Sequence, residues 1–255
     1  MQKANEKAEA LHMTNSVFST PSGIGDITYN VTTARDLMKL AVAVSKNEFL
    51  DKIWHAKEKQ LQIAGKHPRT LPIYSTLNNP EVNSSYSLLA GKTGTWGNTC
   101  HMVAFTEING IRILGVILSS FSNENRFKAM DMLFNISEKL INNPKLDIKK
   151  NYVSFSEAAI SCIITDDDYQ ILYEQNADQK HLAASLTKIL TALTALDYIE
   201  KLDDMLSIKS SDLIHDLNVH FQNGDKLTFE DVFYAMLLPS SNQVATALAR
   251  TLGKL

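Results

Sequence analysis

The sequence predicts an α+β fold, in which helices flank an antiparallel sheet and a mostly helical lobe packs beside it. Three observations predict this class. Two pairs of apolar β segments are each joined by a short polar turn, which is typical of antiparallel hairpins. Helical segments with apolar residues three and four positions apart separate these hairpins. The 255 residues, 44% hydrophobic and 21% charged, suit a globular domain of this kind.

Helical segments dominate the start of the chain. Residues 1–12 show the apolar spacing of a helix, and residues 13–24 are rich in turn-forming residues. Thr32 or Thr33 is placed to cap a second helix. Prolines interrupt residues 57–81, and we expect that stretch to be irregular.

A β region follows, and we expect a strand at residues 87–95. Apolar segments at 102–107 and 111–118 flank an Asn-Gly pair, which is a strong signal of a hairpin. A helix is then expected over residues 125–140. The segment 142–151 is polar and contains a proline, so we interpret it as a linker.

The second half again alternates strands and helices. Its expected elements are a hairpin over 158–173, a helix over 183–202, a polar excursion over 209–228, and helices over 229–238 and 243–252. We therefore predict a single domain over residues 1–255. Its α/β lobe is placed at about residues 70–200, and its helical lobe at about residues 1–70 and 200–255.

Composition excludes several classes of protein. The net charge of −3 gives no reason to expect a nucleic-acid partner. Two cysteines, Cys100 and Cys162, are too few for a disulfide framework, and we expect both to be buried. The seven histidines lack metal-ligand spacing, so no metal or cofactor is expected. No apolar run suits a membrane segment, and the charged N-terminus does not read as a signal peptide.

A serine and a lysine open the helix expected over residues 183–202. Ser185 and Lys188 are three residues apart, so a helix places them on one face within hydrogen-bonding reach. A neighbouring base activates a serine nucleophile, and lysine can serve as that base when burial lowers its pKa. The alternative is a capping serine beside a surface lysine, because this spacing alone recurs by chance.

Two further motifs strengthen the catalytic interpretation. Ser240, Ser241 and Asn242 form an S-x-N motif, and residues 92–95 read Lys-Thr-Gly-Thr. The combination of S-x-x-K, S-x-N and K-T-G is the signature of penicillin-binding proteins and class A β-lactamases.

The sequences around these motifs resemble the serine D-alanyl-D-alanine carboxypeptidases, the low-molecular-mass penicillin-binding proteins. ILYEQNADQKHLAASLTKILTALTALD is similar to the family's entry into its nucleophile helix, and LTFEDVFYAMLLPSSNQVATALA to its S-x-N region. MTNSVFSTPSGI and TTARDLMKLA resemble the stretch that follows. AGKTGTWGNTCHMVAFTEINGIRILGVILSS resembles the K-T-G hairpin. The resemblance covers almost the whole chain and implies a β-lactamase-like, transpeptidase-like fold.

The order of the motifs differs from the family's order. In the family, S-x-x-K precedes S-x-N, and K-T-G comes last, whereas here Lys92 precedes Ser185 and Ser240. The C-terminal ARTLGKL would continue naturally into Met1. We therefore expect a circular permutation, natural or engineered, in which residues 142–151 join the family's own termini. A linker of ten residues spans up to about 33 Å, which leaves slack for that connection.

The resemblance implies roles for the first two motifs. Ser185 would be the acylated nucleophile and Lys188 its base. Ser240 would pass the proton to the leaving amine, while Asn242 holds the substrate amide and the lysine. Ser240 and Asn242 also suit a helix N-cap, which can coexist with catalysis. Ser241 stands where the carboxypeptidases commonly have glycine.

The K-T-G motif would bind the substrate. Lys92 would face the terminal carboxylate, helped by the Thr93 and Thr95 hydroxyls. Gly94 would let the substrate backbone lie against the strand. The N–H groups of Ser185 and Thr95 would form the oxyanion hole. The alternative is an edge-strand turn that Lys92 guards.

Nearby residues are assigned to packing. Trp96 and His101 are expected to be structural, since the serine–lysine chemistry leaves no role for the histidine. Arg35, Asp36 and Arg126 are expected to form structural ion pairs.

These assignments predict an acyl-transfer hydrolase that removes the terminal D-alanine from peptidoglycan stem peptides and that β-lactams inhibit. A β-lactamase is the nearest alternative, but residues 1–60 lack an E-x-x-L-N glutamate motif for the deacylating water. A non-catalytic penicillin-binding scaffold and a promiscuous serine esterase are two further candidates. The substrate class implies an extracytoplasmic location, although we expect no export signal or membrane anchor in this chain.

Overall fold

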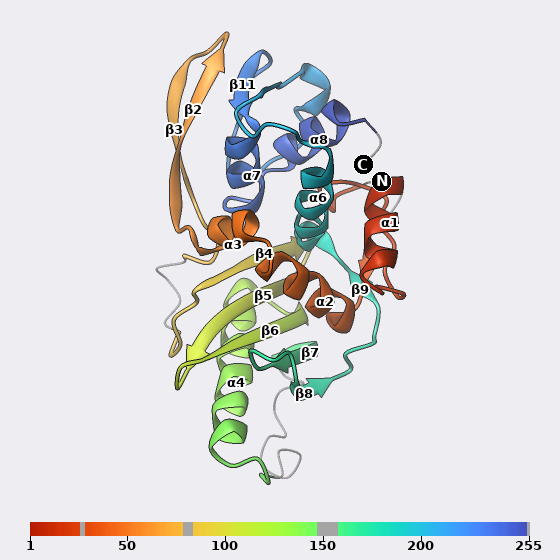
Figure 1. Ribbon diagram of the computed structural model, residues 1–255, viewed down its shortest axis with the longest axis vertical. Helices are drawn as coiled ribbons and strands as arrows, with labels where there is room; N and C mark the ends of the chain where they lie inside the picture. Colours follow the sequence, from red (N-terminus) through yellow and green to blue (C-terminus); the bar gives the residue numbers. More distant parts are fainter. Residues whose placement is uncertain (26–28, 79–83, 147–157, 254–255) are drawn as a thin grey trace.

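The two predicted hairpins lie side by side in one antiparallel sheet (Figure 1). The computed structural model describes residues 1–25, 29–78, 84–146 and 158–253. The sheet has the order β4-β5-β6-β7-β8, with strands β4 (Ala90–Trp96), β5 (Thr99–Ile108), β6 (Ile111–Ser120), β7 (Ala159–Thr165) and β8 (Ile171–Gln175). β6 pairs with β7, so the two halves of the chain share the sheet. The predicted Asn109-Gly110 turn is confirmed, with φ angles of 53° and 80°.

Helices cover both faces of this sheet (Figure 1). α4 (Asn123–Asn142) packs on one face and buries Phe127, Met130 and Phe134 in a core of its own. α2 (Ala34–Ser45) packs on β6 and β7, and Thr33 caps it by accepting a hydrogen bond from the N–H of Asp36. The helices predicted to begin near these positions are therefore confirmed. α2, which we assigned to the helical lobe, contacts the helices α3 (Glu48–His55) and α6 (Thr187–Ala195) as well as the sheet.

A second sheet corrects the prediction for residues 57–81. This sheet has the order β10-β11-β2-β3, with strands β10 (Met205–Ser207), β11 (Asp225–Thr228), β2 (Glu58–Gly65) and β3 (Arg69–Tyr74). Leu61 and Ile63 are buried and alternate with more exposed neighbours, which is a strand pattern. Pro72 is tolerated because β3 is an edge strand that needs no outward N–H bond. Residues 58–74 are thus a hairpin, and the mostly helical lobe carries a sheet.

The remaining elements join the two sheets around the larger core. They are α1 (Gln2–Ala10), α3 (Glu48–His55), the paired strands β1 (Val31–Thr32) and β9 (His181–Leu182), the short 3-10 helices η2 (Ala184–Leu186), η3 (Leu196–Tyr198) and η4 (Ser210–Asp212), and helices α6 (Thr187–Ala195), α7 (Phe229–Leu237) and α8 (Asn242–Thr251). The predicted helices at 1–12, 183–202 and 229–238 are confirmed with shorter bounds, and the helix predicted at 243–252 is confirmed one residue earlier. The predicted linker begins at the last residue of α4, and residues 147–151 lie outside the described part.

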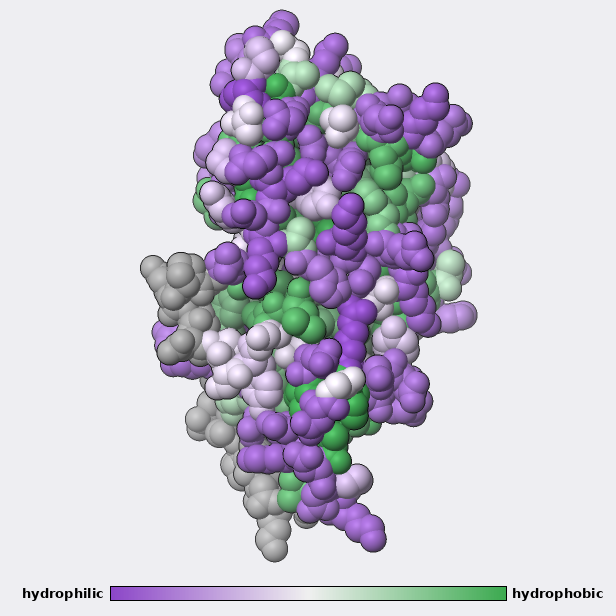
Figure 2. Space-filling view, turned by 60° about the vertical axis from the view of Figure 1, so that its left-hand side comes forward, coloured by the Kyte–Doolittle hydropathy of each residue, from purple (hydrophilic) through white to green (hydrophobic). Residues whose placement is uncertain are grey.

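The surface is largely hydrophilic on the face drawn in Figure 2, where apolar side chains emerge in separate areas. Within the described ranges, no helix is long and apolar enough to cross a membrane. The same residues contain no group of three or more histidine, cysteine, aspartate or glutamate side chains arranged to hold a metal ion.

Candidate active site

Ser185 and Lys188 are hydrogen-bonded at the start of α6. Ser185 lies in η2, and the Lys188 ammonium group donates to the Ser185 hydroxyl at 2.9 Å. Lys188 is fully buried and also donates to Asn242 Oδ1 at 2.7 Å and to the carbonyl of Ser22 at 2.8 Å. The structure therefore brings together the serine, lysine and asparagine of two motifs that are more than fifty residues apart.

Burial changes the acid–base character of Lys188. Removal from water disfavours the charged amine and lowers its pKa to about 7, although the nearby Asp216 carboxylate raises it. A lysine with a pKa near neutrality is a competent general base at neutral pH. The alternative of a surface lysine beside a capping serine is therefore wrong.

The loop before β1 supports the turn that carries Ser185. Gly23 has φ of 84°, and a Cβ atom there would lie 1.8 Å from the carbonyl oxygen of Ala184. Ala184 itself has φ of 47°, a left-handed conformation that is unusual for an alanine. The Pro21 carbonyl accepts a hydrogen bond from the Thr191 hydroxyl at 2.8 Å. This close packing places the Ser22 carbonyl on the Lys188 amine.

The S-x-N motif occupies the turn between α7 and α8. Ser241 caps α8 by accepting a hydrogen bond from the N–H of Val244, and Asn242 is the first helical residue. Ser240 has φ of 70°, and its buried hydroxyl has no hydrogen-bond partner among the described residues. An unsatisfied buried hydroxyl is costly, and this serine is one of the residues that line the cavity described below.

The K-T-G strand β4 packs against the turn that carries Ser185. A Cβ atom on Gly94 would lie 3.1 Å from Leu186 Cγ and 3.2 Å from the Leu186 nitrogen, so a side chain there would crowd the turn. Thr93 Oγ1 is 2.6 Å from Thr76 Oγ1. Lys92 is fully buried and donates to the Thr93 carbonyl at 2.7 Å. Burial, with smaller effects from the charges of Lys188 and Arg126, lowers the pKa of Lys92 well below its usual value.

Arg126 is a site residue that the sequence did not reveal. It extends from the first turns of α4, and its guanidinium donates to the Gly94 carbonyl at 3.2 Å and to Thr95 Oγ1 at 3.0 Å. It also donates to Asn123, and it forms no ion pair within the described ranges. Its predicted structural ion pair is therefore wrong for those residues. No signal in the sequence separated this arginine from an ordinary surface residue of a helix.

The other two predicted ion-pairing residues do form ion pairs. Arg35 contacts Glu174 at 2.9 Å and Asp178 at 2.8 Å, and Asp36 contacts Lys39 at 2.9 Å.

A cavity of about 310 Å³ brings these groups to one surface. The predicted residues that line it are Ser185, Ser240, Asn242, Thr93 and Thr95. Arg126 and Asp216 line it as well, and Leu217 stands at its edge with 78% of its surface exposed. Lys92, Lys188 and Gly94 are not among its lining residues.

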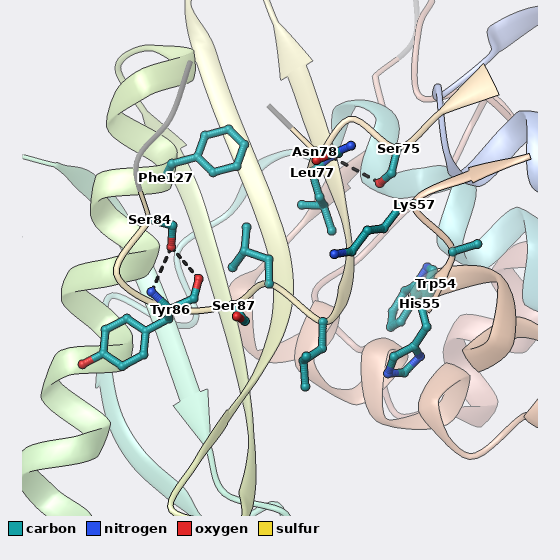
Figure 3. A pocket seen from close by; sticks show the side chains of 13 residues that line it. Trp54, His55, Lys57, Ser75, Leu77, Asn78, Ser84, Tyr86, Ser87 and Phe127 are labelled. Atoms are coloured by element: carbon teal, nitrogen blue, oxygen red, sulfur yellow. Dashed lines mark hydrogen bonds between the residues drawn. The ribbon is translucent and has the colours of Figure 1, made fainter. Parts of the chain in front are cut away.

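A second cavity, of about 270 Å³, is drawn in Figure 3. Ser75 and Leu77 line it, whereas Thr76 between them lines the first cavity. The Ser84 hydroxyl oxygen lies 2.5 Å from Asp131 Oδ1 and 2.7 Å from the Tyr86 carbonyl oxygen, and its single hydrogen can be donated to either acceptor. Lys57 and Ser75 line this cavity and meet through the backbone, where the Ser75 N–H donates to the Lys57 carbonyl at 2.8 Å. Among the described residues, no hydrogen bond joins a serine hydroxyl to a lysine amine there, so the first cavity remains the candidate site.

The residues assigned to packing are embedded in the fold. His101 accepts a hydrogen bond from the N–H of Ser119 at 2.9 Å, and burial lowers its pKa to about 3. Trp96 packs edge-to-face on Tyr29, with ring centroids 6.2 Å apart. Cys100 and Cys162 are buried free thiols, as predicted, although Cys100 also lines the first cavity.

Comparison with known proteins agrees with this geometry. The family model of the D-alanyl-D-alanine carboxypeptidases matches residues 1–122 and 149–253. The chain belongs to this family. The match confirms the resemblance seen in the sequence, and the mixed α+β architecture agrees with the predicted fold class.

Two curated relatives are D-alanyl-D-alanine endopeptidases. The chain is 32% identical over 124 residues to the enzyme of Pseudomonas aeruginosa and 29% identical over 124 residues to that of Escherichia coli. Each alignment covers 48% of this chain and 39% of the relative, so the chain matches well under half the length of either protein. No solved structure matches this chain.

Proposed function

We propose that the protein is a serine acyl-transfer hydrolase that cleaves the D-Ala-D-Ala bond of peptidoglycan stem peptides. One observation carries the proposal: the Lys188 amine contacts both Ser185 Oγ and Asn242 Oδ1 behind a cavity that Ser185 and Asn242 line. The family's cell-wall substrate implies that the protein acts outside the cytoplasm.

The first chemical step uses neutral Lys188 as the base. The amine takes the Ser185 hydroxyl proton while Oγ attacks the carbonyl carbon of the penultimate D-alanine. The N–H groups of Ser185 and Thr95 receive the developing oxyanion. Protonated Lys188 returns its proton through the Ser240 hydroxyl, which gives its own proton to the leaving nitrogen and receives the one from Lys188; the C–N bond breaks, and D-alanine departs. Water then cleaves the Ser185 ester and restores the hydroxyl.

Arg126 and the two threonines are proposed to bind the terminal carboxylate of the substrate. The Arg126 guanidinium lies at the cavity wall, whereas Lys92 is fully buried and is not among the lining residues. Burial lowers the pKa of both groups, but the guanidinium starts from a much higher value and keeps its charge. Thr93 and Thr95 add hydroxyl donors on the same strand. Arg126 therefore supplies the positive charge at the cavity wall, and Lys92 supports the carboxylate site from its buried position on β4.

The alternative functions differ from this one in a definite step. A β-lactamase would hydrolyse its acyl-enzyme rapidly, and a non-catalytic scaffold would not form one. A β-lactamase needs a base for the deacylating water. Asp216 is the only carboxylate among the described residues of the cavity wall, and its Oδ2 already accepts hydrogen bonds from Ser241 and Asn242. A non-catalytic scaffold has no need of the Ser185–Lys188 contact. Both points favour an enzyme that penicillin acylates and that releases the drug slowly, over a β-lactamase and over a non-catalytic scaffold.

Endopeptidase activity is the second candidate, and the printed names of the two relatives favour it. Both activities use the same acyl-enzyme and differ only in the leaving amine. Product analysis by mass spectrometry after incubation with a pentapeptide muropeptide and a cross-linked dimer separates them. We expect D-alanine release from the pentapeptide and none from Ser185→Ala. If monomers are released from the dimer while no D-alanine is released from the pentapeptide, the enzyme is an endopeptidase.

The motif order is proposed to reflect a circular permutation. The family model matches two segments, and strands β6 and β7 from these segments pair directly, with Leu114 opposite Thr165. A reordered chain tests this proposal, with residue 253 joined to residue 1 by a flexible linker and the chain opened between residues 146 and 158. We expect it to fold and to take up penicillin as the original chain does. A reordered chain that folds but is not acylated would contradict the proposal.

A further inference from the structure

We propose that Asp216 is a positioning residue for the Ser185 reaction: its carboxylate fixes the start of α8, and Ser241 acts as its partner. The inference rests on the proposed acyl-transfer function. It concerns a residue outside the three motifs, and it gives the serine at position 241 a specific task.

The Asp216 carboxylate caps a helix that belongs to another part of the chain. Its Oδ2 accepts hydrogen bonds from the Ser241 hydroxyl at 2.6 Å and from the N–H of Asn242 at 2.7 Å. Only 5% of the Asp216 surface is exposed. The first turn of α8 has no acidic residue of its own, so Asp216 supplies the negative charge that a helix N-terminus favours.

The residues before Asp216 set the orientation of the Asn242 amide. Asn242 Nδ2 donates to the His215 carbonyl at 2.9 Å, so its Oδ1 is turned toward Lys188. Gln243 Nε2 donates to the Ile214 carbonyl at 3.1 Å. Residues 214–216 therefore hold the α8 start by both backbone and side-chain contacts. The contact between Asn242 and Lys188 depends on this placement.

Ser241 completes the arrangement without backbone strain. Its φ is −58°, so the backbone does not require glycine there. Its hydroxyl gives Asp216 a third donor besides the N–H groups of Asn242 and Gln243, the latter at 3.4 Å. A glycine would leave the carboxylate with backbone donors only. The serine and the aspartate are thus one hydrogen-bonded unit.

Asp216 also acts on Lys188 through its charge. The charged groups near Lys188 are Lys92 from β4 and Asp216 from the segment before β11, while Arg126 from α4 acts on Lys92. The Asp216 charge raises the pKa of Lys188 and opposes the effect of burial. Neutral Lys188 is the active base, so acylation increases as the pH rises through this pKa. Loss of the Asp216 charge therefore moves that increase to lower pH.

The variant Asp216→Asn tests the proposal through the pH profile of acylation by a fluorescent penicillin. We expect the rate constant at its plateau to fall about tenfold, as when one charge-assisted hydrogen bond is lost. We also expect the rising limb of this pH profile, which is the range over which the rate increases with pH, to move to lower pH. A purely structural role would lower the rate without moving the limb. An unchanged rate and an unchanged limb would overturn the proposal.

Asp212→Asn is a matched control on the same segment. Asp212 is also buried, but it pairs with Arg250 at the opposite end of α8, at 2.8 Å. We expect this variant to lower the melting temperature without moving the limb. A limb shift in Asp212→Asn equal to that in Asp216→Asn would contradict a specific role for Asp216.

Ser241→Ala decides the matter if Asp216→Asn fails to fold. It removes one donor and keeps the carboxylate charge, so we expect a severalfold lower rate with the limb in place. A wild-type rate would overturn the proposal. Wild-type protein that takes up no penicillin would instead contradict the acyl-transfer function on which the inference rests.

Discussion

Replacement of Gly94 by alanine tests how closely the K-T-G strand must approach the nucleophile. The new Cβ would lie 3.1 Å from Leu186 Cγ, 3.2 Å from the Leu186 nitrogen and 3.4 Å from the Ala183 carbonyl. The leucine side chain can yield, but the backbone nitrogen cannot, so strand and turn must separate by a few tenths of an ångström. A displacement of about 1 Å costs roughly a hundredfold in rate. We therefore expect Gly94→Ala to slow acylation by about tenfold.

The assay is the second-order rate constant for acylation by a fluorescent penicillin, measured beside the melting temperature. Gly115→Ala is the matched control, because a Cβ there would lie 2.6 Å from Met130 Sδ in the separate core under α4. We expect it to lower the melting temperature and leave acylation of the folded protein unchanged. A wild-type acylation rate in Gly94→Ala would refute the reasoning, since no separation would then be needed.

Three further predictions follow from charged and titrating groups. Arg126→Met should lower kcat/KM for a D-Ala-D-Ala peptide by about a hundredfold, as expected for a lost charged hydrogen bond to the terminal carboxylate, and should spare a neutral thioester substrate; an equal loss on both substrates would contradict the carboxylate role. The acylation rate should rise with pH through about 7, because the neutral form of Lys188 is the base; a rate that is flat from pH 5 to about 9 would contradict that role. His101 has a pKa lowered from 6.5 to about 3, so the unfolded chain binds a proton that the folded chain excludes, and stability falls as the pH drops below 6.5. Urea unfolding at several pH values should show a smaller decrease in His101→Asn, and an identical decrease in both proteins would exclude the histidine as its source.

The geometry of the candidate site was predictable where it is local in the sequence. Ser185 and Lys188 meet because three residues span most of one helical turn. The motifs around Asn242 and Lys92 were recognisable as patterns. Their convergence on Ser185 depends on packing between segments that are distant in the sequence.

The contacts that were missed join distant segments. The Ser22 carbonyl is 166 residues away from the amine whose hydrogen bond it accepts, and nothing in its turn-rich surroundings marks it. Arg126 looks like any polar residue of an amphipathic helix until β4 lies beside it. Asp216 sits in a polar stretch that reads as a solvated excursion. Tertiary structure alone brings the Ser22 carbonyl to Lys188, Arg126 to the cavity wall and Asp216 to the start of α8.

The fold was predictable except where local signals conflicted. The hairpins around β6 and β7 combine apolar strands with short polar turns, and both were identified. In β2 and β3 the alternation of Leu61 and Ile63 with polar neighbours competes with nearby prolines. Pro72 is compatible with a strand because β3 lies at the edge of its sheet, a position that cannot be predicted from the sequence.

The mass of the intact protein after brief exposure to benzylpenicillin, followed by peptide mapping, tests the proposed acyl-enzyme chemistry most directly. We predict one persistent penicilloyl adduct, located on Ser185, in wild-type protein and none in Ser185→Ala. Such an adduct requires the nucleophile, its base and the oxyanion hole to assemble in the observed motif order. An unmodified protein beside intact drug would contradict this chemistry, and an unmodified protein beside hydrolysed drug would make the protein a β-lactamase.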